Sequence, residues 1–167
     1  MGKSSRGEGL LYLVRHGKAE EAHALGDGAR GLTADGRRAF RELLGQIAGK
    51  LSLQGIATSP LVRAVQTAEL LAEATAVDEV QVHGPLSYDL GTAADVLTLA
   101  RTRGPGWALV GHNPTMGEAL AQALGLGTEA ARFRKGAIAA LRPPADAKGR
   151  WQLAWVISPG RDFETEI

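Results

Sequence analysis

The apolar residues of this chain gather in short continuous runs, separated by longer segments in which they recur with helical spacing. Leu10–Val14 is five consecutive apolar residues, the pattern of a strand that is buried on both faces. Further apolar runs predict strands that begin at Ile56 and that span Val80–Val82 and Trp107–Val110, and a C-terminal hairpin of Ala137–Leu141 and Trp151–Ile157.

Four helices are predicted between these runs, each introduced by a residue that can accept a hydrogen bond from the first turn. Thr33 caps the first helix, with Asp35 favoured in its first turn by the helix dipole. Ser59 and Asn113 are predicted as caps followed by a proline as first helical residue, and Thr92 caps the helix between them. The predicted core faces are Phe40, Leu43, Leu44, Ile47 and Leu51 for the helix after Thr33; Leu61, Val65, Ala68 and Ala72 for the helix after Ser59; and Val96, Leu97 and Ala100 for the helix after Thr92. The helix after Asn113 is predicted to run to about Leu124.

Strands that alternate with helices predict a three-layer α/β/α fold with a mostly parallel central sheet. The C-terminal hairpin is expected to add an antiparallel edge. A length of 167 residues favours a single domain. We place that domain at residues 10–167 and expect the polar, glycine-rich residues 1–9 to be a mobile segment.

The composition argues against several classes of partner and site. Lys and Arg number 19 against 18 Asp and Glu, a net charge of +1, so no overall field attracts nucleic acid or an anionic membrane. The absence of cysteine excludes a disulfide framework, a thiol nucleophile and a cysteine-based zinc site. The apolar run near the N-terminus is too short for a signal peptide or a membrane span, which predicts a cytoplasmic protein.

Polar residues follow three of the predicted strands at the point where each strand ends. The three segments are Arg15-His16-Gly17, Ser59-Pro60 with Arg63, and Gly111-His112-Asn113. Ligands of parallel α/β sheets bind beyond the carboxyl ends of the strands. We therefore expect the three segments to meet in one crevice.

Two arginines and two histidines in one crevice would form a pocket for a dianion. Arg15 and Arg63 offer paired N–H donors that match phosphate oxygens. Gly17 would let the backbone approach the ligand closely, and the helices after Ser59 and Asn113 would direct N–H groups towards it. A neutral imidazole can attack phosphorus, so one histidine could be the nucleophile while the other donates hydrogen bonds to the transferred group.

Other patterns are interpreted as structural. His23 and His83 stand in polar or turn-like surroundings, and we expect both to be exposed to solvent. The segment GDGARG at 26–31 fits G-x-G-x-x-G, but it does not join a strand to a helix, which favours a glycine-rich loop over a dinucleotide site. No H-E-x-x-H pattern occurs in the sequence, so no metal site is expected.

The motifs, taken in order, resemble those of the histidine phosphatase superfamily, which has the phosphoglycerate-mutase-like fold. They are Arg15-His16-Gly17; Ser59, Pro60, Arg63, Gln66, Thr67 and Ala68 in a pattern SP-x-x-R-x-x-Q-T-A; Gly111 to Pro114; and RGLTADGR at 30–37. With short connections between its elements, the chain is most similar to the SixA-type phosphohistidine phosphatases.

The resemblance implies that His16 is the nucleophile and passes through a phosphohistidine intermediate. It implies that Arg15, Arg63 and His112 bind the phosphoryl oxygens and stabilise the transition state. The expected phosphate-binding set is completed by Gly17 and Asn113. No metal or other cofactor is implied, because the arginines neutralise the charge that a magnesium ion neutralises elsewhere.

The resemblance leaves the general acid open. Larger members of the superfamily that act on phosphate esters supply a carboxyl group after the third strand, where this chain reads LSYDLGTAADV. Asp89 is the candidate acid, or else a turn residue before Gly91, and Asp95 is expected on a helix surface. Imidazole leaves phosphorus readily, since its conjugate acid has a pKa of about 6.5, whereas an alkoxide must be protonated as it departs. A weak acid therefore favours phosphohistidine as substrate.

The sequence thus predicts a metal-independent phosphatase that acts on a phosphorylated protein, at phosphohistidine, or on a small phosphorylated molecule. One alternative is a phosphomonoesterase whose acid is Asp89 or a residue of the loop Lys18–Asp27. Another is a phosphate-binding module without turnover, although binding alone would need the arginines and not the histidine pair. Specificity is expected from the segments 19–31 and 84–92, and the sequence does not indicate an oligomeric state.

Overall fold

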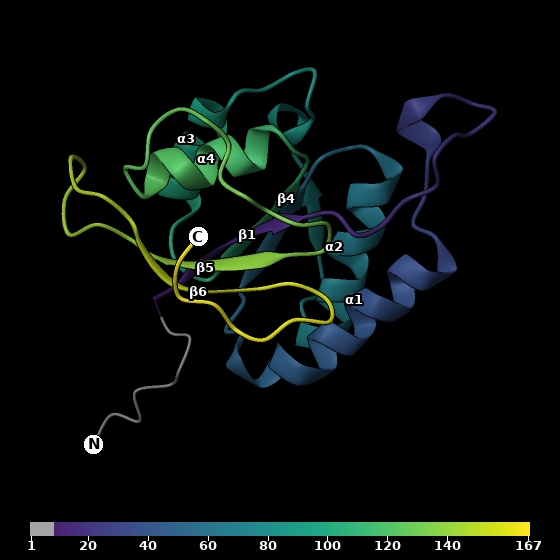
Figure 1. Ribbon diagram of the computed structural model, residues 1–167, viewed down its shortest axis with the longest axis horizontal. Helices are drawn as coiled ribbons and strands as arrows, with labels where there is room; N and C mark the ends of the chain where they lie inside the picture. Colours follow the sequence, from purple (N-terminus) through teal and green to yellow (C-terminus); the bar gives the residue numbers. More distant parts are fainter. Residues whose placement is uncertain (1–8) are drawn as a thin grey trace.

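A computed structural model describes residues 9–167, which form a six-stranded sheet in the order β3-β2-β4-β1-β5-β6 (Figure 1). The strands are β1 (Leu11–Arg15), β2 (Gly55–Thr58), β3 (Val80–Val82), β4 (Trp107–Gly111), β5 (Ile138–Arg142) and β6 (Gln152–Ile157). β1 to β4 are parallel, and β5 and β6 are antiparallel to their neighbours. This confirms the predicted parallel sheet with an antiparallel edge. Residues 1–8 of the predicted N-terminal segment lie outside the described residues.

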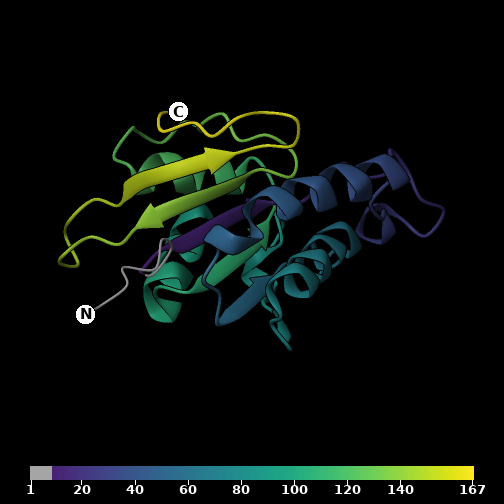
Figure 2. The ribbon, with the colours of Figure 1, turned by 90° about the horizontal axis from the view of Figure 1, so that it is seen from below.

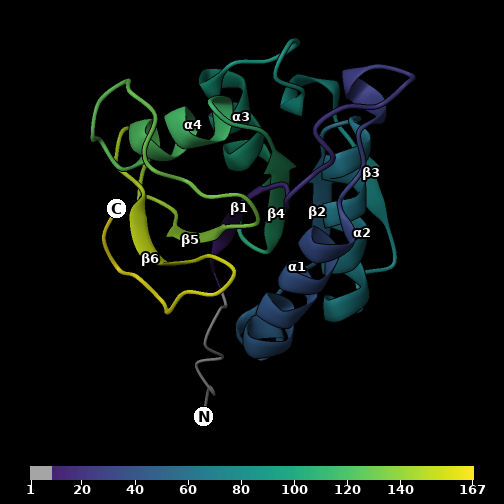
Figure 3. The same cartoon turned by 45° about the vertical axis from the view of Figure 1, so that its right-hand side comes forward.

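Helices cover both faces of the sheet, as predicted. Their bounds are α1 (Ala34–Ile47), α2 (Val62–Thr75), α3 (Ala93–Arg103) and α4 (Thr115–Ala123), with short 3-10 turns η1 (Asp27–Ala29), η2 (Ala48–Lys50) and η3 (Gly84–Leu86). Figures 2 and 3 show α1 and α2 together on one face and α3 and α4 on the other. Within residues 9–167, no helix is long and apolar enough to cross a membrane.

The central strand β1 contributes to both cores, which explains its uninterrupted apolar sequence. Leu11 and Leu13 pack with α3 and α4, whereas Tyr12 and Val14 pack with α1 and α2. Successive side chains of a strand point to opposite faces of a sheet, so each face needs its own apolar set. Because β1 is paired on one side with β4 and on the other with β5, the backbone that leads to Arg15 is held from every direction.

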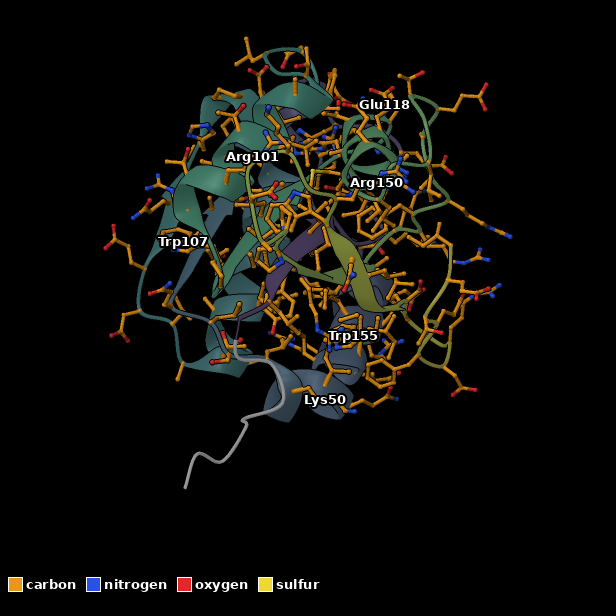
Figure 4. The ribbon with its side chains drawn as sticks, turned by 90° about the vertical axis from the view of Figure 1, so that its left-hand side faces the viewer. Lys50, Arg101, Trp107, Glu118, Arg150 and Trp155 are labelled. Carbon is orange, nitrogen blue, oxygen red and sulfur yellow. The ribbon has the colours of Figure 1, made fainter. Side chains whose placement is uncertain are left out.

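Aromatic side chains pack against one another at the antiparallel edge of the sheet. Trp155 of β6 lies 6.0 Å from Tyr12 of β1 and 5.3 Å from Phe163, measured between ring centroids. Lys50 Nζ lies 4.6 Å from the centroid of the Phe163 ring, and Figure 4 shows Lys50 and Trp155 near each other on this side of the molecule. The segment after β6 is thereby held against the sheet.

Two of the four predicted helix caps are confirmed. The Thr33 hydroxyl oxygen accepts a hydrogen bond from the Gly36 N–H at 2.9 Å. Thr92 and Asp95 form a reciprocal capping box at the start of α3, and Asp95 is exposed as predicted.

The other two cap predictions are wrong in position. α2 begins at Val62 after Leu61, not at Pro60, and α4 begins at Thr115 after Pro114. The Ser59 hydroxyl oxygen accepts from the Leu61 N–H at 3.2 Å and is also bonded to Nε2 of His112, at 2.7 Å. Asn113 Oδ1 still accepts from the Gly117 N–H in the first turn of α4, while its Nδ2 donates to the backbone oxygen of Phe133. Both side chains serve contacts with distant segments, which a local cap pattern does not reveal.

The predicted core face of α2 is confirmed at Ala68 but is otherwise rotated relative to the real one. Val65 and Ala72 are only half-buried, and the buried side of the helix carries Arg63, Ala64, Thr67, Ala68, Leu70 and Leu71. A polar pair, Arg63 and Thr67, takes part of the inward face, and apolar periodicity alone cannot identify polar residues that are buried. Leu51 lies beyond the end of α1 and is half-buried.

Two glycines of α1 offer a matched test of this packing. A Cβ added at Gly36 would lie 2.2 Å from the backbone oxygen of Lys18, whereas one at Gly45 would meet nothing within 4 Å. We expect Gly36→Ala to lower the free energy of unfolding by about 1–3 kcal/mol, as overpacking does. Gly45→Ala is expected to raise it by about 0.5–1 kcal/mol, because alanine loses less backbone entropy in a helix. Urea unfolding measures both, and equal effects would contradict the described contact with Lys18.

Candidate active site

The carboxyl ends of three neighbouring strands bring the predicted segments together, as the sequence indicated. In the sheet β4 lies between β2 and β1, with Arg15 beside Gly111 and Thr58 beside Val110. The chain is fixed just beyond the strands too, since the His16 N–H donates to the Gly111 oxygen at 3.1 Å. The rings of His16 and His112 lie 5.1 Å apart between centroids, both buried.

His16 is held in the neutral tautomer that a nucleophile requires. Its Nδ1 lies 2.7 Å from the backbone oxygen of Gly17. A carbonyl oxygen can only accept, so Nδ1 carries the proton and Nε2 keeps its lone pair. Burial lowers the pKa of His16 to about 4, and the positive charges of Arg63 and Arg15 add to this effect. The ring is therefore uncharged at neutral pH and can attack an electrophile.

His112 is neutral for similar reasons. Burial lowers its pKa to about 3, with further contributions from His16 and Arg63. Its Nε2 is bonded to the Ser59 hydroxyl, and its Nδ1 has no hydrogen-bond partner within the described part of the chain. Arg15 Nε is likewise buried without a partner there. Both atoms are thus available to the oxygens of a bound anion.

Each arginine of the site is oriented by protein oxygens. One terminal nitrogen of Arg15 donates to the Phe133 oxygen at 3.0 Å. Arg63, only 4% exposed, donates to the backbone oxygen and to Oδ2 of Asp27, at 2.9 and 3.1 Å. A guanidinium has five N–H donors, so both arginines keep donors for a ligand after these bonds. Together they supply the positive charge of an oxyanion pocket.

Gly17 and Asn113 lie beside these residues and have bonds of their own. The Gly17 N–H donates to the Thr67 hydroxyl at 3.1 Å, and that hydroxyl donates to the Arg63 oxygen at 2.7 Å. Asn113 Nδ2 donates to the Phe133 oxygen at 2.8 Å, the same oxygen that accepts from Arg15. These bonds connect the ends of the strands to α2 and to the segment before β5. The direct contacts of Gly17 and Asn113 with phosphate remain predictions.

Asp27 and Tyr88 are part of the site although the sequence did not reveal them. The Tyr88 hydroxyl donates to Asp27 Oδ2 at 2.9 Å, and its ring stands edge-on to His112 with centroids 5.7 Å apart. The Arg63 guanidinium lies 5.9 Å from the centroid of the same ring. Hydrogen bonds from Arg30 and Tyr88, with help from Arg63, lower the pKa of Asp27 to about 2. The sequence pointed to their segments, Lys18–Asp27 as a possible source of the acid and 19–31 and 84–92 as sources of specificity, but no local signal singles out Asp27 or Tyr88 within them.

The structure places Asp89, the candidate acid, on the outer side of this stretch. Its carboxylate accepts from the Ser87 hydroxyl, and the residue is exposed. Asp27, from the alternative loop, faces the site but is held ionised. The carboxyl group that faces the site is therefore not prepared to give a proton to a leaving group.

The remaining histidines are not part of the site, and the glycine-rich segment contributes Asp27 to it without being a dinucleotide site. His23 is exposed, as predicted, whereas His83 is half-buried because its backbone continues β3 along β2 and donates to the Thr58 oxygen. The GDGARG segment forms η1 and does not join a strand to a helix. Within residues 9–167, no three histidine or carboxylate side chains gather in a way that could hold a metal ion.

Comparisons with known proteins agree with this geometry. The profile of the histidine phosphatase superfamily (branch 1) matches residues 11–87. An uncharacterized protein of Picosynechococcus sp. is 39% identical over 142 residues, which are 81% of this chain and 86% of that protein.

Two solved structures match along almost their whole length. The protein histidine phosphatase SixA in complex with tungstate aligns with a TM-score of 0.75 and 25% identity, over 90% of this chain and 97% of that one. A phosphohistidine phosphatase SixA candidate from Agrobacterium tumefaciens gives a TM-score of 0.74 and 25% identity, over 90% and 99% of the two chains. The fold described here is therefore that of these small proteins.

The neutral state of the two buried histidines can be measured by NMR. The ring resonances of His16 and His112, assigned with His16→Ala and His112→Ala variants, should keep the shifts of neutral imidazole from about pH 8 down to about pH 5, where an unperturbed ring titrates near 6.5. The nitrogen shifts of His16 should identify Nδ1 as the protonated nitrogen. Titration of either ring above about pH 6 would contradict the described burial.

The lowered pKa values of His16 and His112 also determine how the stability of the fold changes with pH. Because both pKa values are lower in the folded state than in the unfolded chain, the folded state binds fewer protons. This contribution to stability is complete above about pH 6.5 and declines as the pH falls towards the folded values.

Proposed function

The chain belongs to the histidine phosphatase superfamily, and we propose that it hydrolyses phosphohistidine through a phosphorylated intermediate on His16. Its membership makes it a phosphatase, so a phosphate-binding module without turnover is set aside. The observation that carries the proposal is the His16 ring, which is buried and neutral with Nδ1–H bonded to Gly17, beside two arginines.

In the first step, Nε2 of His16 attacks phosphorus. The Nε2–P bond forms as the bond from phosphorus to the leaving group breaks, and the electron pair of that bond departs with the leaving group. The attacking ring gains positive charge, which the carbonyl oxygen of Gly17 stabilises at Nδ1–H. Arg15 and Arg63 stabilise the charge on the transferred oxygens, and His112 contributes a hydrogen bond through the ring nitrogen that has no protein partner.

In the second step, water attacks the phosphorus of the phosphorylated His16. The P–Nε2 electron pair returns to the ring, which leaves it neutral again, and inorganic phosphate is released as dihydrogen phosphate, which holds the oxygen and both protons of the water. The protein groups that stabilise the first transition state have the same positions for the second, because both transfers use the same three phosphoryl oxygens.

The leaving group that fits this site is an imidazole. Asp27, the carboxyl group that faces the site, is ionised, and it therefore does not support the departure of an alkoxide, which needs a proton from a general acid. A phosphorylated imidazole that carries a proton on its second nitrogen departs as a neutral molecule. A phosphomonoesterase for small esters, the alternative, would require Asp27 or Asp89 to be protonated.

The nucleophile can be tested by substitution and by trapping. We expect His16→Ala to lower hydrolysis of an aryl phosphate by at least about a thousandfold, since it removes the attacking atom. Wild type that is exposed briefly to labelled substrate should retain label that is stable to alkali and lost in acid, as a phosphoramidate is. The control is His23→Ala, which removes an exposed histidine on the loop before η1 and should keep both properties. Undiminished hydrolysis in His16→Ala would overturn the assignment.

The leaving-group preference needs a separate measurement. In wild type, kcat/KM for a phosphohistidine peptide should exceed that for alkyl phosphates by at least about a hundredfold, the usual contribution of a general acid. Asp89→Asn should leave this ratio unchanged. If alkyl phosphates are the better substrates and Asp89→Asn selectively removes their hydrolysis, the enzyme is a phosphomonoesterase and the proposal is wrong.

A further inference from the structure

Asp27 stands at the opening of a site whose reacting groups are buried. Its side chain is 44% exposed, whereas His16 and Arg63 are buried. Figure 3 shows the loop around η1 beyond the end of the sheet to which the arrow of β4 points. We propose that Asp27 accepts a hydrogen bond from the N–H of the leaving imidazole and so selects phosphohistidine over phosphate esters. This inference rests on the proposed function, because it names the residue that recognises the leaving group of that reaction.

The direction of attack places the leaving group at this opening. In a phosphoryl transfer the attacking and leaving atoms lie on opposite sides of phosphorus. Because the ring of His16 is buried, the group that departs from phosphorus points away from it, towards the opening. Asp27 and Tyr88 are about half exposed there and are bonded to each other, and the edge of the Tyr88 ring packs against His112. The leaving imidazole therefore meets the pair of Asp27 and Tyr88.

The Asp27 carboxylate keeps an acceptor position free after its bonds within the protein. Oδ1 accepts from Arg30 at 2.7 Å, and Oδ2 accepts from Arg63 at 3.1 Å and from the Tyr88 hydroxyl at 2.9 Å. The two oxygens of a carboxylate offer about four lone-pair positions, so three donors leave one for a ligand. The same three donors hold the carboxylate in place before a substrate arrives. Asp27 is thus a preorganised acceptor with room for one more N–H group.

The negative charge of Asp27 favours the form of the substrate that can react. When the P–N bond of phosphohistidine breaks, its electron pair passes to the ring, which departs as neutral imidazole if its other nitrogen carries a proton. That proton stays on the ring, so Asp27 neither gives nor takes one. An adjacent negative charge raises the pKa of the substrate ring and keeps this nitrogen protonated. Hydrogen bonds from Arg30 and Tyr88 lower the pKa of Asp27 to about 2, so its charge is present throughout the neutral range.

The same charge acts against phosphate esters. The oxygen of an ester gains negative charge as its bond to phosphorus breaks, and a carboxylate beside it repels that charge. Asp27 therefore stabilises one leaving group and destabilises the other. Because specificity is a difference between two free energies, both effects contribute to it.

The test compares two leaving groups in one variant. Asp27→Asn removes the charge and keeps the backbone oxygen that accepts from Arg63 at 2.9 Å. We expect kcat/KM for phosphoimidazole to fall by about tenfold, the effect of one opposite charge on a neighbouring pKa. For para-nitrophenyl phosphate, whose leaving group departs as an anion, kcat/KM should stay the same or rise. Asp89→Asn is the matched control: it removes an exposed carboxylate that is bonded to Ser87 and should change neither value.

A pH profile gives a second readout, which a role limited to orienting Arg63 would not move. Because kcat reports ionisations in the complex, kcat for phosphoimidazole should begin to decline with rising pH about one pH unit earlier in Asp27→Asn than in wild type. The charged and titratable groups that face Asp27 are Arg30 after η1, Arg63 of α2, Tyr88 after η3 and His112 after β4. Arginine is charged at every pH of this profile, the bond to Asp27 raises the pKa of Tyr88, and His112 is neutral. The shift would therefore belong to the substrate ring.

The outcomes separate this inference from the proposed function. Retained hydrolysis of para-nitrophenyl phosphate shows that Asp27→Asn is folded. Equal losses on the two substrates, or no loss on either, overturn the inference and leave the proposed function intact, since Asp27 would then act on Arg63 alone or not at all. An unshifted pH profile also overturns it. Wild type that hydrolyses the aryl phosphate but neither phosphoimidazole nor a phosphohistidine peptide overturns the proposed function itself.

Discussion

The hydrogen bond from His16 Nδ1 to the Gly17 oxygen is the constraint on which the site depends. It fixes the tautomer, so the lone pair is at Nε2, and it prepares the ring for the charge that an attack would create. Burial and two arginines make the charged ring unfavourable before the reaction. The same arginines would become favourable partners as soon as a phosphoryl group places negative charge between them and the ring. The bond therefore determines the direction of attack, while burial and the arginines determine the neutral resting state.

The rest of the fold keeps that bond and its surroundings in position. β1 is buried on both faces and paired on both edges, so the backbone of Arg15 and His16 has little freedom. The guanidinium groups are oriented by oxygens from elsewhere, Arg15 by Phe133 and Arg63 by Asp27. Two arginines close together repel one another, and these acceptors compensate part of that cost in the absence of ligand. The apparatus for binding an anion is thus preorganised.

Sequence patterns predicted the scaffold well and the side-chain contacts less well. The order of strands and helices, the caps at Thr33 and Thr92, and the meeting of three strand ends all follow from local signals. Ser59 and Asn113 carry the same local signals as those caps, yet the helices begin later. The Ser59 hydroxyl is bonded to His112, 53 positions away, and Asn113 to Phe133, 20 positions away. Both side chains also keep a local bond, Ser59 Oγ from the Leu61 N–H and Asn113 Oδ1 from the Gly117 N–H, so a pattern within a few residues shows the near partner and misses the distant one.

The sequence by itself determined that β1 is buried, that polar motifs end three parallel strands, and that Arg15, His16, Arg63 and His112 meet at their carboxyl ends. These results depend on periodicity and on the geometry of parallel sheets, which act over short stretches or apply to every such fold. Tertiary structure alone decided that Asp27 orients Arg63 and that the Tyr88 ring packs edge-on against His112. Asp27 is bonded to both Arg63 and Tyr88, which are 36 and 61 positions away from it along the chain. The physical reason is that a hydrogen bond depends on distance in space, and for a loop that distance is set by the packing of the whole chain.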